Sequence, residues 1–305
     1  MMSFKKLFHI TGPTSSGKTL LAIKLGKRLN AQIVSCDSRQ FFKEMKIGTA
    51  VPSEIQLSQC VHHFIQHKSI TDDYNVGKYQ KDAIFLLKKL FKDNQYLILV
   101  GGSGLYADSV IYGLDDFPEP IPEIKKELRE ILKTKGLVYL RNLLKEKDYK
   151  YYKYVDLNNT HRIIRALEVC FSSNLPYSSF IGNKKSPDFF KTATIRINIE
   201  RKTLYEKINK KIDQMILDGL ENEVRFLSHY KSLNSMQTVG YKEWFAYWEN
   251  LSSYQETVEL IKKNTRRFAK RQITWNKKYL NAINYTHDQN IDNIIDLLNK
   301  TVTKS

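Results

Sequence analysis

Apolar residues form three short runs in the first hundred positions. LFHI (7–10), AQIVSCDS (31–38) and QYLILV (95–100) have the length and composition of strands. Between them, apolar positions recur at helical spacing over 18–29 and 75–94, where Ala83, Leu86, Leu87 and Leu90 share one face. The third run is apolar throughout, as expected for a strand covered on both faces. This alternation predicts a parallel α/β sheet flanked by helices.

The pattern changes after the third strand. GLDDFPEPIPEI (113–124) combines glycine, acidic residues and three prolines, which is typical of a boundary. From Pro122 to about Ser173 the spacing is helical only, with Gly136 predicted to end the first helix and Asn159 to cap a later one. A strand is expected at 192–200, long helices near 201–218, 240–249 and 254–278, and a last strand and helix in the tail. We therefore predict an α/β core from 1–114 and 192–305, with a helical insertion at 115–191.

The stretch behind the first strand, GPTSSGKT, has the spacing of a phosphate-binding loop. Gly12, Gly17, Lys18 and Thr19 meet the pattern G-x-x-x-x-G-K-[ST]. Such a loop aims backbone N–H groups and a helix N-terminus at phosphate oxygens, while the lysine adds a full charge. The threonine hydroxyl is suited to Mg²⁺. A chance match in a turn is improbable here because a strand precedes the loop and a helix follows it.

The loop alone does not identify its anion. In a hydrolytic NTPase an aspartate ends an apolar strand and holds Mg²⁺, but the strand YLILV ends in Gly101 and Gly102. The acidic residue at a strand end is Asp37, and Ser103 follows the glycine pair. Because parallel strands end at one crevice, we expect Asp37, Ser103 and the loop to converge. A turn-forming or capping role for Asp37 is the alternative.

Composition and charge narrow the class of protein. The 305 residues carry a formal net charge of +17, which favours a polyanionic partner such as nucleic acid, although a uniformly lysine-rich surface is the alternative. The three cysteines lack metal-ligand spacing and fit a reducing compartment. No run approaches the length of a membrane span or a signal peptide, so a cytoplasmic protein is expected.

The positive charge is concentrated near the C-terminus. The segment KKNTRRFAKRQITWNKK (262–278) contains no acidic residue. On a helix, Lys263, Arg267 and either Lys270 or Arg271 share one face, and like charges stacked this way favour an anionic partner. A solvated face is the alternative.

Six stretches together resemble one family, the tRNA dimethylallyltransferases, or tRNA isopentenyltransferases. They occur in the family's order and reach from residue 12 to about 276. They are GPTSSGKT (12–19), DSRQFF with MKIGTAVP (37–52), GGSGLY (101–106), RIIRALEV (162–169), TVGYKE (238–243) and RRFAKRQITW (266–275).

The resemblance implies a fold and a reaction. The fold would be a P-loop NTPase-like core, in which the loop holds dimethylallyl diphosphate in place of ATP. The enzyme would transfer the dimethylallyl group to N6 of the adenosine 3′ to the anticodon, giving N6-(dimethylallyl)adenosine. Asp37 matches the family's catalytic aspartate, a base for the N6 proton. Ser103 is the second catalytic candidate: it stands where threonine is common and keeps the hydroxyl for a contact with the diphosphate, the metal or the base. The loop donors and Mg²⁺ at Thr19 would neutralise the leaving diphosphate. The diphosphate loop would comprise Gly12, Pro13, Thr14, Ser15, Ser16, Gly17, Lys18 and Thr19.

The resemblance also implies contacts with tRNA. The adenine must leave its stack to enter the crevice. Lys125 aligns on position alone, and His161 stands where glutamine is frequent. A monomer is expected because no stretch indicates a subunit interface. The implied tRNA-binding residues are Asp37, Ser38, Arg39, Gln40, Ser103, Lys125, His161, Arg162, Ile163, Ile164, Arg165, Arg267, Lys270 and Arg271.

Two other functions use the same features differently. A small-molecule or nucleoside kinase would bind ATP at the loop and use Asp37 as its base. A non-catalytic RNA-binding protein would carry a degenerate loop, which the intact Lys18, Thr19 and Asp37 argue against.

Overall fold

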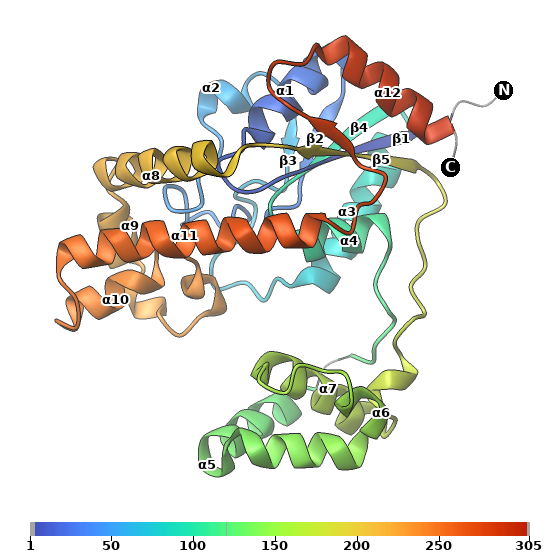
Figure 1. The fold of residues 1–305 in the computed structure, drawn as a ribbon. Helices are drawn as coiled ribbons and strands as arrows, with labels where there is room; N and C mark the ends of the chain where they lie inside the picture. The colour runs from blue at the N-terminus through green and yellow to red at the C-terminus, as the bar shows by residue number, and fades with distance from the viewer. Residues whose placement is uncertain (1–3, 120, 304–305) are drawn as a thin grey trace. The chain divides into compact units, whose positions relative to one another are not determined.

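A computed structural model describes residues 4–119 and 121–303 (Figure 1). Residues 1–3, 120 and 304–305, which belong to the predicted domains, lie outside the described residues. The chain divides into two compact units, one made of Met1–Ile111 with Pro187–Ser305 and the other of Tyr112–Ser186. The second unit is thus an insertion into the first.

The first unit is built on a parallel sheet with the strand order β3-β2-β4-β1-β5-β6. β1 is central and pairs with β4 on one side and β5 on the other. The carboxyl ends of β1, β2 and β4 therefore meet at one edge, where ligands bind in open α/β sheets. The strands are β1 (Lys6–Thr11), β2 (Gln32–Ser35), β3 (His62–His63), β4 (Tyr96–Val100), β5 (Lys191–Ile197) and β6 (Ile283–Tyr285).

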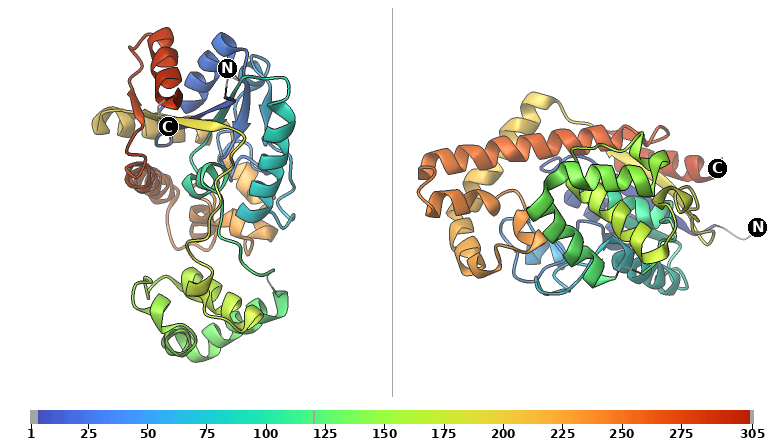
Figure 2. Two further views of the ribbon diagram at one scale, coloured as in Figure 1. Left: turned by 90° about the vertical axis from the view of Figure 1, so that its right-hand side faces the viewer. Right: turned by 90° about the horizontal axis from the view of Figure 1, so that it is seen from below.

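Both faces of the sheet are covered, as the apolar strands predict. Side chains alternate across a strand, so Phe8 and Ile98 pack with α1 and α12 on one face. Leu7 and Leu99 pack with α3 and α4 on the other. The edge-on view in Figure 2 shows α12 and α3 on opposite sides of the sheet.

The helices and strands of this unit follow the predicted periods, with several differences. β2 ends at Ser35, so Asp37 lies in the following loop. The expected helix at 240–249 is only Lys242–Trp248, and a separate helix precedes it. The edge strand β3, only two residues long, was too short to predict. The helices are α1 (Lys18–Leu29), α2 (Glu54–Leu57), α3 (Val76–Leu90), α4 (Gly104–Ile111), α8 (Arg201–Leu217), α9 (Leu220–Phe226), α10 (Lys242–Trp248), α11 (Tyr254–Asn276) and α12 (Ile291–Thr303).

Helices α8 to α11 form their own apolar cluster in the first unit. Leu204 and Ile208 of α8 pack with Trp244 of α10 and Ile261 of α11. Phe42, from the loop after β2, joins them. This packing ties the helices to the loop that follows Asp37.

The insertion consists of helices around a separate core. Leu128, Leu140, Leu144 and Ile163 are buried together. Gly136 adopts φ 76°, which breaks the long helix where the sequence predicts an end. The side chain of Asn159 accepts a hydrogen bond from Arg162 N, so the predicted cap is confirmed. The helices are α5 (Pro122–Lys147), α6 (Tyr149–Tyr152) and α7 (Thr160–Ser173).

Candidate active site

The glycine loop connects β1 to α1, as the motif predicts. Gly17 adopts φ 91° directly before Lys18, the first residue of α1. A side chain at Gly17 would also collide with the ring of His287, whose Nε2 donates to Ser16 O at 2.7 Å. The hydroxyls of Ser15 and Ser16 are buried without a hydrogen-bond partner among the described residues. Buried hydroxyls normally find a partner, so the loop suits an anion that accepts from them.

Lys18 lies inside this loop. Its Nζ donates to Pro13 O at 2.8 Å. Burial lowers the pKa of Lys18 to about 8, against an opposing effect of Asp37, and nearby Lys211 lowers it further. Burial also lowers the pKa of Lys211, again opposed by Asp37. Two partly desolvated ammonium groups beside one carboxylate form a site that can bind a multivalent anion.

A pocket of about 760 Å³ joins the loop to the carboxylate. It brings together Lys18, Thr19 and Asp37, as the sequence predicts. Its wall also includes residues that sequence reasoning missed. They include the cations Lys207 and Lys211 of α8, His287 after β6, and the loop residues Thr49, Ala50, Val51, Pro52 and Ser53.

Ser103 lies beside the loop that carries Asp37. Its Oγ accepts from Ser38 N at 3.0 Å and lies 2.9 Å from Ser38 Oγ. The backbone of the turn after β4 also lies close to the backbone of the Asp37 loop, because a Cβ on Gly101 would lie 2.6 Å from Asp37 N. Gly101 therefore lets the turn after β4 approach the loop after β2. Asp37 and the glycine loop share the pocket, whereas Ser103 contacts the Asp37 loop through Ser38 and is not among the residues that line the pocket.

Arg39 and Gln40 are engaged within the protein. The amide of Gln40 donates to Thr49 O at 3.2 Å and to Ala50 O at 2.9 Å while lining the pocket. Arg39 N donates to Asp37 Oδ1 at 3.2 Å, and its guanidinium donates to Asn234 O at 3.2 Å. Gln40 thus shapes the wall of the pocket, and Arg39 orients the carboxylate.

A carboxylate on α9 holds the loop that forms the pocket wall. Glu223 accepts from Lys46 N, Ile47 N and Gly48 N at 2.8 to 3.0 Å. It also accepts from the hydroxyl of Tyr241 at 2.5 Å, which raises the pKa of that tyrosine beyond the effect of burial alone. The stretches MKIGTAVP and TVGYKE, far apart in sequence, thus support one pocket wall.

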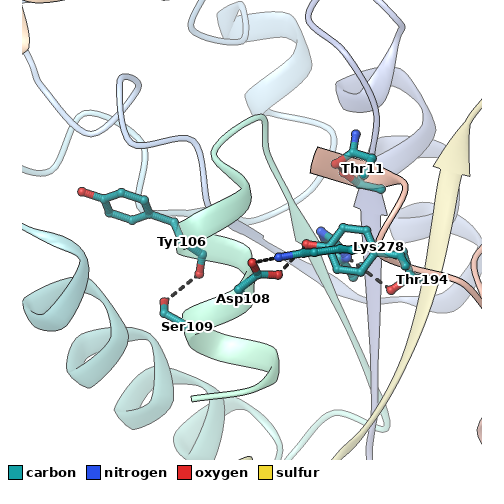
Figure 3. Close-up of polar contacts among 9 residues, drawn as sticks. Thr11, Tyr106, Asp108, Ser109, Thr194 and Lys278 are labelled. Atoms are coloured by element: carbon teal, nitrogen blue, oxygen red, sulfur yellow. Dashed lines mark hydrogen bonds and ion pairs between the residues drawn. The ribbon is translucent and has the colours of Figure 1, made fainter. Parts of the chain in front are cut away.

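Helix α11 lies across the carboxyl edge of the sheet. A Cβ on Gly102 would collide with Gln272 of the helix, and a Cβ on Gly104 would collide with Trp275. These glycines therefore permit the close approach of the helix to the turn after β4. At its end, Lys278 forms an ion pair with Asp108 of α4 (Figure 3). The hydroxyl of Tyr279 donates to the same carboxylate at 2.7 Å. The helix is therefore fixed to the sheet and to α4.

The outer face of α11 is basic, but two of the lysines in the basic segment have acidic partners that the sequence did not indicate. Lys262 pairs with Asp213 and Glu259, and Lys278 with Asp108, so acidic partners come from outside the basic segment. Within residues 4–119 and 121–303, no acidic side chain pairs with Arg267, Lys270 or Arg271. These three line an open hollow of about 770 Å³ together with Thr274, Trp275 and Lys278.

The insertion residues for which the resemblance implies contact with tRNA differ in their exposure to solvent. Lys125, His161 and Arg162 are exposed, and Arg165 is half-buried. The guanidinium of Arg165 lies 5.4 Å from the ring centre of Phe117 and 3.4 Å from Glu168. Ile163 and Ile164 are instead buried in the core of the unit. Their side chains pack α7 into this core and are not exposed for the contact with tRNA that the resemblance implies.

The part of the chain that the structure describes has neither a cluster of metal-ligating side chains nor a helix suited to a membrane. No group of three or more His, Cys, Asp or Glu side chains there is placed to hold a metal ion. No helix among those residues has the length and apolarity needed to cross a membrane.

The fold and the site define a class of proteins, the P-loop α/β proteins, here with a carboxylate that faces the glycine loop from the loop after β2. A family model described as IPP transferase matches residues 40–279. The chain belongs to this family.

Curated relatives agree over almost the whole chain. A tRNA dimethylallyltransferase of Christiangramia forsetii is 47% identical over 97% of this chain and 98% of its own length. One from Flavobacterium psychrophilum is 46% identical over 96% and 97%.

Solved structures have the same fold. The tRNA isopentenylpyrophosphate transferase of Bacillus halodurans has a TM-score of 0.72, with 31% identity and 98% coverage of both chains. A eukaryotic dimethylallyltransferase that acts on tRNA has a TM-score of 0.76 at 23% identity, covering 89% of this chain and 69% of its own. The P-loop NTPase-like fold expected from the sequence is confirmed.

Proposed function

We propose that this chain transfers a dimethylallyl group from dimethylallyl diphosphate to N6 of the adenosine 3′ to the anticodon in tRNA. The observation that carries the proposal is the shared pocket of Lys18, Thr19 and Asp37. It joins a diphosphate-binding loop to a carboxylate base. The turn after β4 offers glycines and Ser103 where a hydrolytic NTPase has an aspartate.

The donor binds at the loop end of the pocket. The backbone of residues 15–19 and the ammonium groups of Lys18, Lys207 and Lys211 neutralise the diphosphate, whose negative charge grows as the C–O bond breaks. Val51, Pro52 and Ile65 line the same pocket and provide apolar surface for the five-carbon chain.

The acceptor adenine reacts at the carboxylate end. Its exocyclic amine is a weak nucleophile because the ring shares its lone pair. As N6 attacks the first carbon of the donor, the diphosphate leaves with the bonding electrons and Asp37 takes the N6 proton. Arg39 N and the bond between Ser38 N and Ser103 hold the Asp37 loop in place. The base enters the pocket by leaving its stack, as in other enzymes that act on nucleobases.

The oxygen atoms of the pocket fit Mg²⁺. Thr19, Ser35 and Asp37 line it, and hydroxyl and carboxylate oxygens are ligands that Mg²⁺ accepts, usually together with water and phosphate oxygens. Thr19 would hold the ion. The bound ion would supply further charge neutralisation to the departing diphosphate.

Two surfaces are proposed to bind the anticodon stem-loop. Arg267, Lys270 and Arg271 of α11 are exposed cations suited to phosphate contacts. In the insertion, Lys125, Arg162 and Arg165 have the same charge, and His161 directly precedes Arg162. Trp275, at the hollow on α11, provides an aromatic face on which a base can stack.

The test is product analysis with a choice of donor. Purified protein is incubated with Mg²⁺, unmodified tRNA and either dimethylallyl diphosphate or ATP, and the digested nucleosides are analysed by mass spectrometry. An adenosine gaining one C5H8 unit with the first donor supports the proposal. ATP-dependent phosphorylation without prenylation would establish a kinase, and tRNA binding without any product a non-catalytic protein. The proposed cytoplasmic location and monomeric state are checked by fractionation and sedimentation.

A further inference from the structure

The buried face of α11 changes character along its length. From its start to Ala269 the buried residues are Thr257, Val258, Ile261 and Ala269, and Ile261 and Ala269 pack in the apolar cluster of α8 to α11. Its last turns contribute Gln272 and Asn276, which are 6% and 5% exposed. The change occurs where the helix passes from the helical cluster to the carboxyl edge of the sheet, because side chains there meet loop backbone.

The amide of Gln272 joins two loops of the candidate active site. Its Oε1 accepts from Thr14 N at 2.7 Å, and its Nε2 donates to Gly102 O at 2.9 Å. One atom must accept and the other must donate. A carboxylate of the same length satisfies only the first bond, and an apolar side chain satisfies neither.

The two segments that Gln272 contacts belong to opposite sides of the proposed active site, one at the donor and the other at the carboxylate base. Thr14 belongs to the loop that binds the diphosphate, and its N–H is bonded to Gln272. Gly102 precedes Ser103, whose hydroxyl accepts from Ser38 N beside Asp37. A single side chain therefore fixes the separation between the donor loop and the turn that supports the carboxylate loop.

Neighbouring polar contacts of the helix have other roles. Asn276 accepts from the hydroxyl of Thr11 at 2.8 Å and thereby holds the helix to the end of β1. The amide of Asn264 donates to Glu243 at 2.8 Å and holds the helix to α10. Among these amides, Gln272 bonds to both loops.

We propose that Gln272 is a positioning residue for prenyl transfer, which sets the distance and angle between the bound donor and the amine that Asp37 deprotonates. The inference rests on the function proposed above. In-line displacement is sensitive to alignment, and a misplacement of about 1 Å costs about 100-fold in rate. Loss of the amide should therefore slow the chemical step without weakening tRNA binding.

The test compares two isosteric replacements on one helix. Gln272→Met removes both loop contacts, and Asn264→Leu removes a contact to α10 and is the matched control. Single-turnover transfer at saturating dimethylallyl diphosphate, the dissociation constant for tRNA and the midpoint of thermal unfolding are measured for each. We expect Gln272→Met to lower the transfer rate about 10- to 100-fold with unchanged tRNA affinity. Asn264→Leu should lower the unfolding midpoint and leave the rate unchanged.

Several outcomes would overturn the inference. They are an unchanged rate in Gln272→Met, a rate loss matched by an equal loss of tRNA affinity, or equal rate losses in both variants. If Gln272→Met does not fold, Gln272→Asn replaces it, since its amide is one methylene too short to reach both loops. If neither folds cooperatively, Gln272 is a folding residue and the inference fails. An inactive wild-type protein would instead reject the proposed function.

Discussion

At the residue scale, the pocket is organised around a cation and a carboxylate. Lys18 closes the phosphate loop, and Asp37 faces the same cavity from the loop after β2. Burial lowers the pKa of Lys18 to about 8. The positive charge proposed to bind the diphosphate is therefore present at neutral pH and is lost as the pH rises through about 8.

This leads to a prediction on pH. Only the ammonium form of Lys18 attracts a diphosphate, so the affinity for inorganic diphosphate, taken relative to that of the variant Lys18→Arg at the same pH, should fall as the pH rises through the pKa of about 8. Calorimetric titration on both sides of that pH checks this, and an unchanged relative affinity would contradict it. The variant Lys18→Arg should bind more weakly but without the decline, because a guanidinium stays charged.

The lowered pKa of Lys18 also affects folding stability, which should rise with pH where the affinity for diphosphate falls. Between the folded pKa of about 8 and the ordinary value of 10.5, the unfolded chain holds a proton on Lys18 that the folded chain has lost. The contribution of this group to folding stability therefore rises with pH across that interval.

At the element scale, the inner and outer faces of α11 have different contacts and different proposed roles. Its inner face packs on the helical cluster and hydrogen-bonds to the active-site loops. Its outer face presents Arg267, Lys270 and Arg271 around an open hollow. A single helix thus connects the proposed RNA contacts with the proposed site of chemistry.

The outer face gives a prediction on salt dependence. Arg267→Ala, Lys270→Ala and Arg271→Ala should each weaken tRNA binding and reduce the slope of log affinity against log salt concentration by about 1. The matched control is Lys89→Ala, an exposed lysine on α3. Filter binding at several salt concentrations measures the slope. Equal slopes for wild-type protein and all three α11 variants would remove the helix from the RNA-binding surface.

The sequence predicted the elements whose signals are local. The spacing of GPTSSGKT specifies the loop, and the parallel sheet brings Asp37 and Ser103 to its edge. Lys211 and His287 escaped prediction because only tertiary packing brings α8 and the loop after β6 to the pocket. Gln272 lies within the basic segment, where the sequence gives no sign of its role. Its hydrogen bonds depend on where α11 crosses the edge of the sheet, which only the tertiary structure shows. Ile163 and Ile164 stand in a matching motif, but their helix turns them into the core.

At the scale of the whole molecule, the chain contains two units with separate cores. The first unit holds the proposed chemistry, with the loop, Asp37 and α11 all within it. The insertion packs Leu128, Leu140 and Leu167 around its own centre. Catalysis and part of RNA recognition are therefore proposed to reside in units that fold around different residues.

Replacing residues 112–186 by a short Gly/Ser linker tests this division. The remaining unit should unfold cooperatively and bind inorganic diphosphate as the full chain does, because its core and pocket are made of its own residues. Its tRNA affinity should fall at least about tenfold, since several phosphate contacts are lost. Loss of cooperative unfolding would show that the cores depend on each other, and unchanged tRNA affinity would exclude the insertion from binding.

The central claim is that the Asp37 carboxylate deprotonates the amine while the glycine loop holds the leaving diphosphate. Single-turnover prenyl transfer by Asp37→Asn tests it most directly, because asparagine keeps the shape of the side chain and loses the base. We predict a rate about 10²- to 10⁴-fold below that of the wild-type protein, with unchanged affinities for tRNA and diphosphate. A variant that transfers the dimethylallyl group at the full rate would contradict the account.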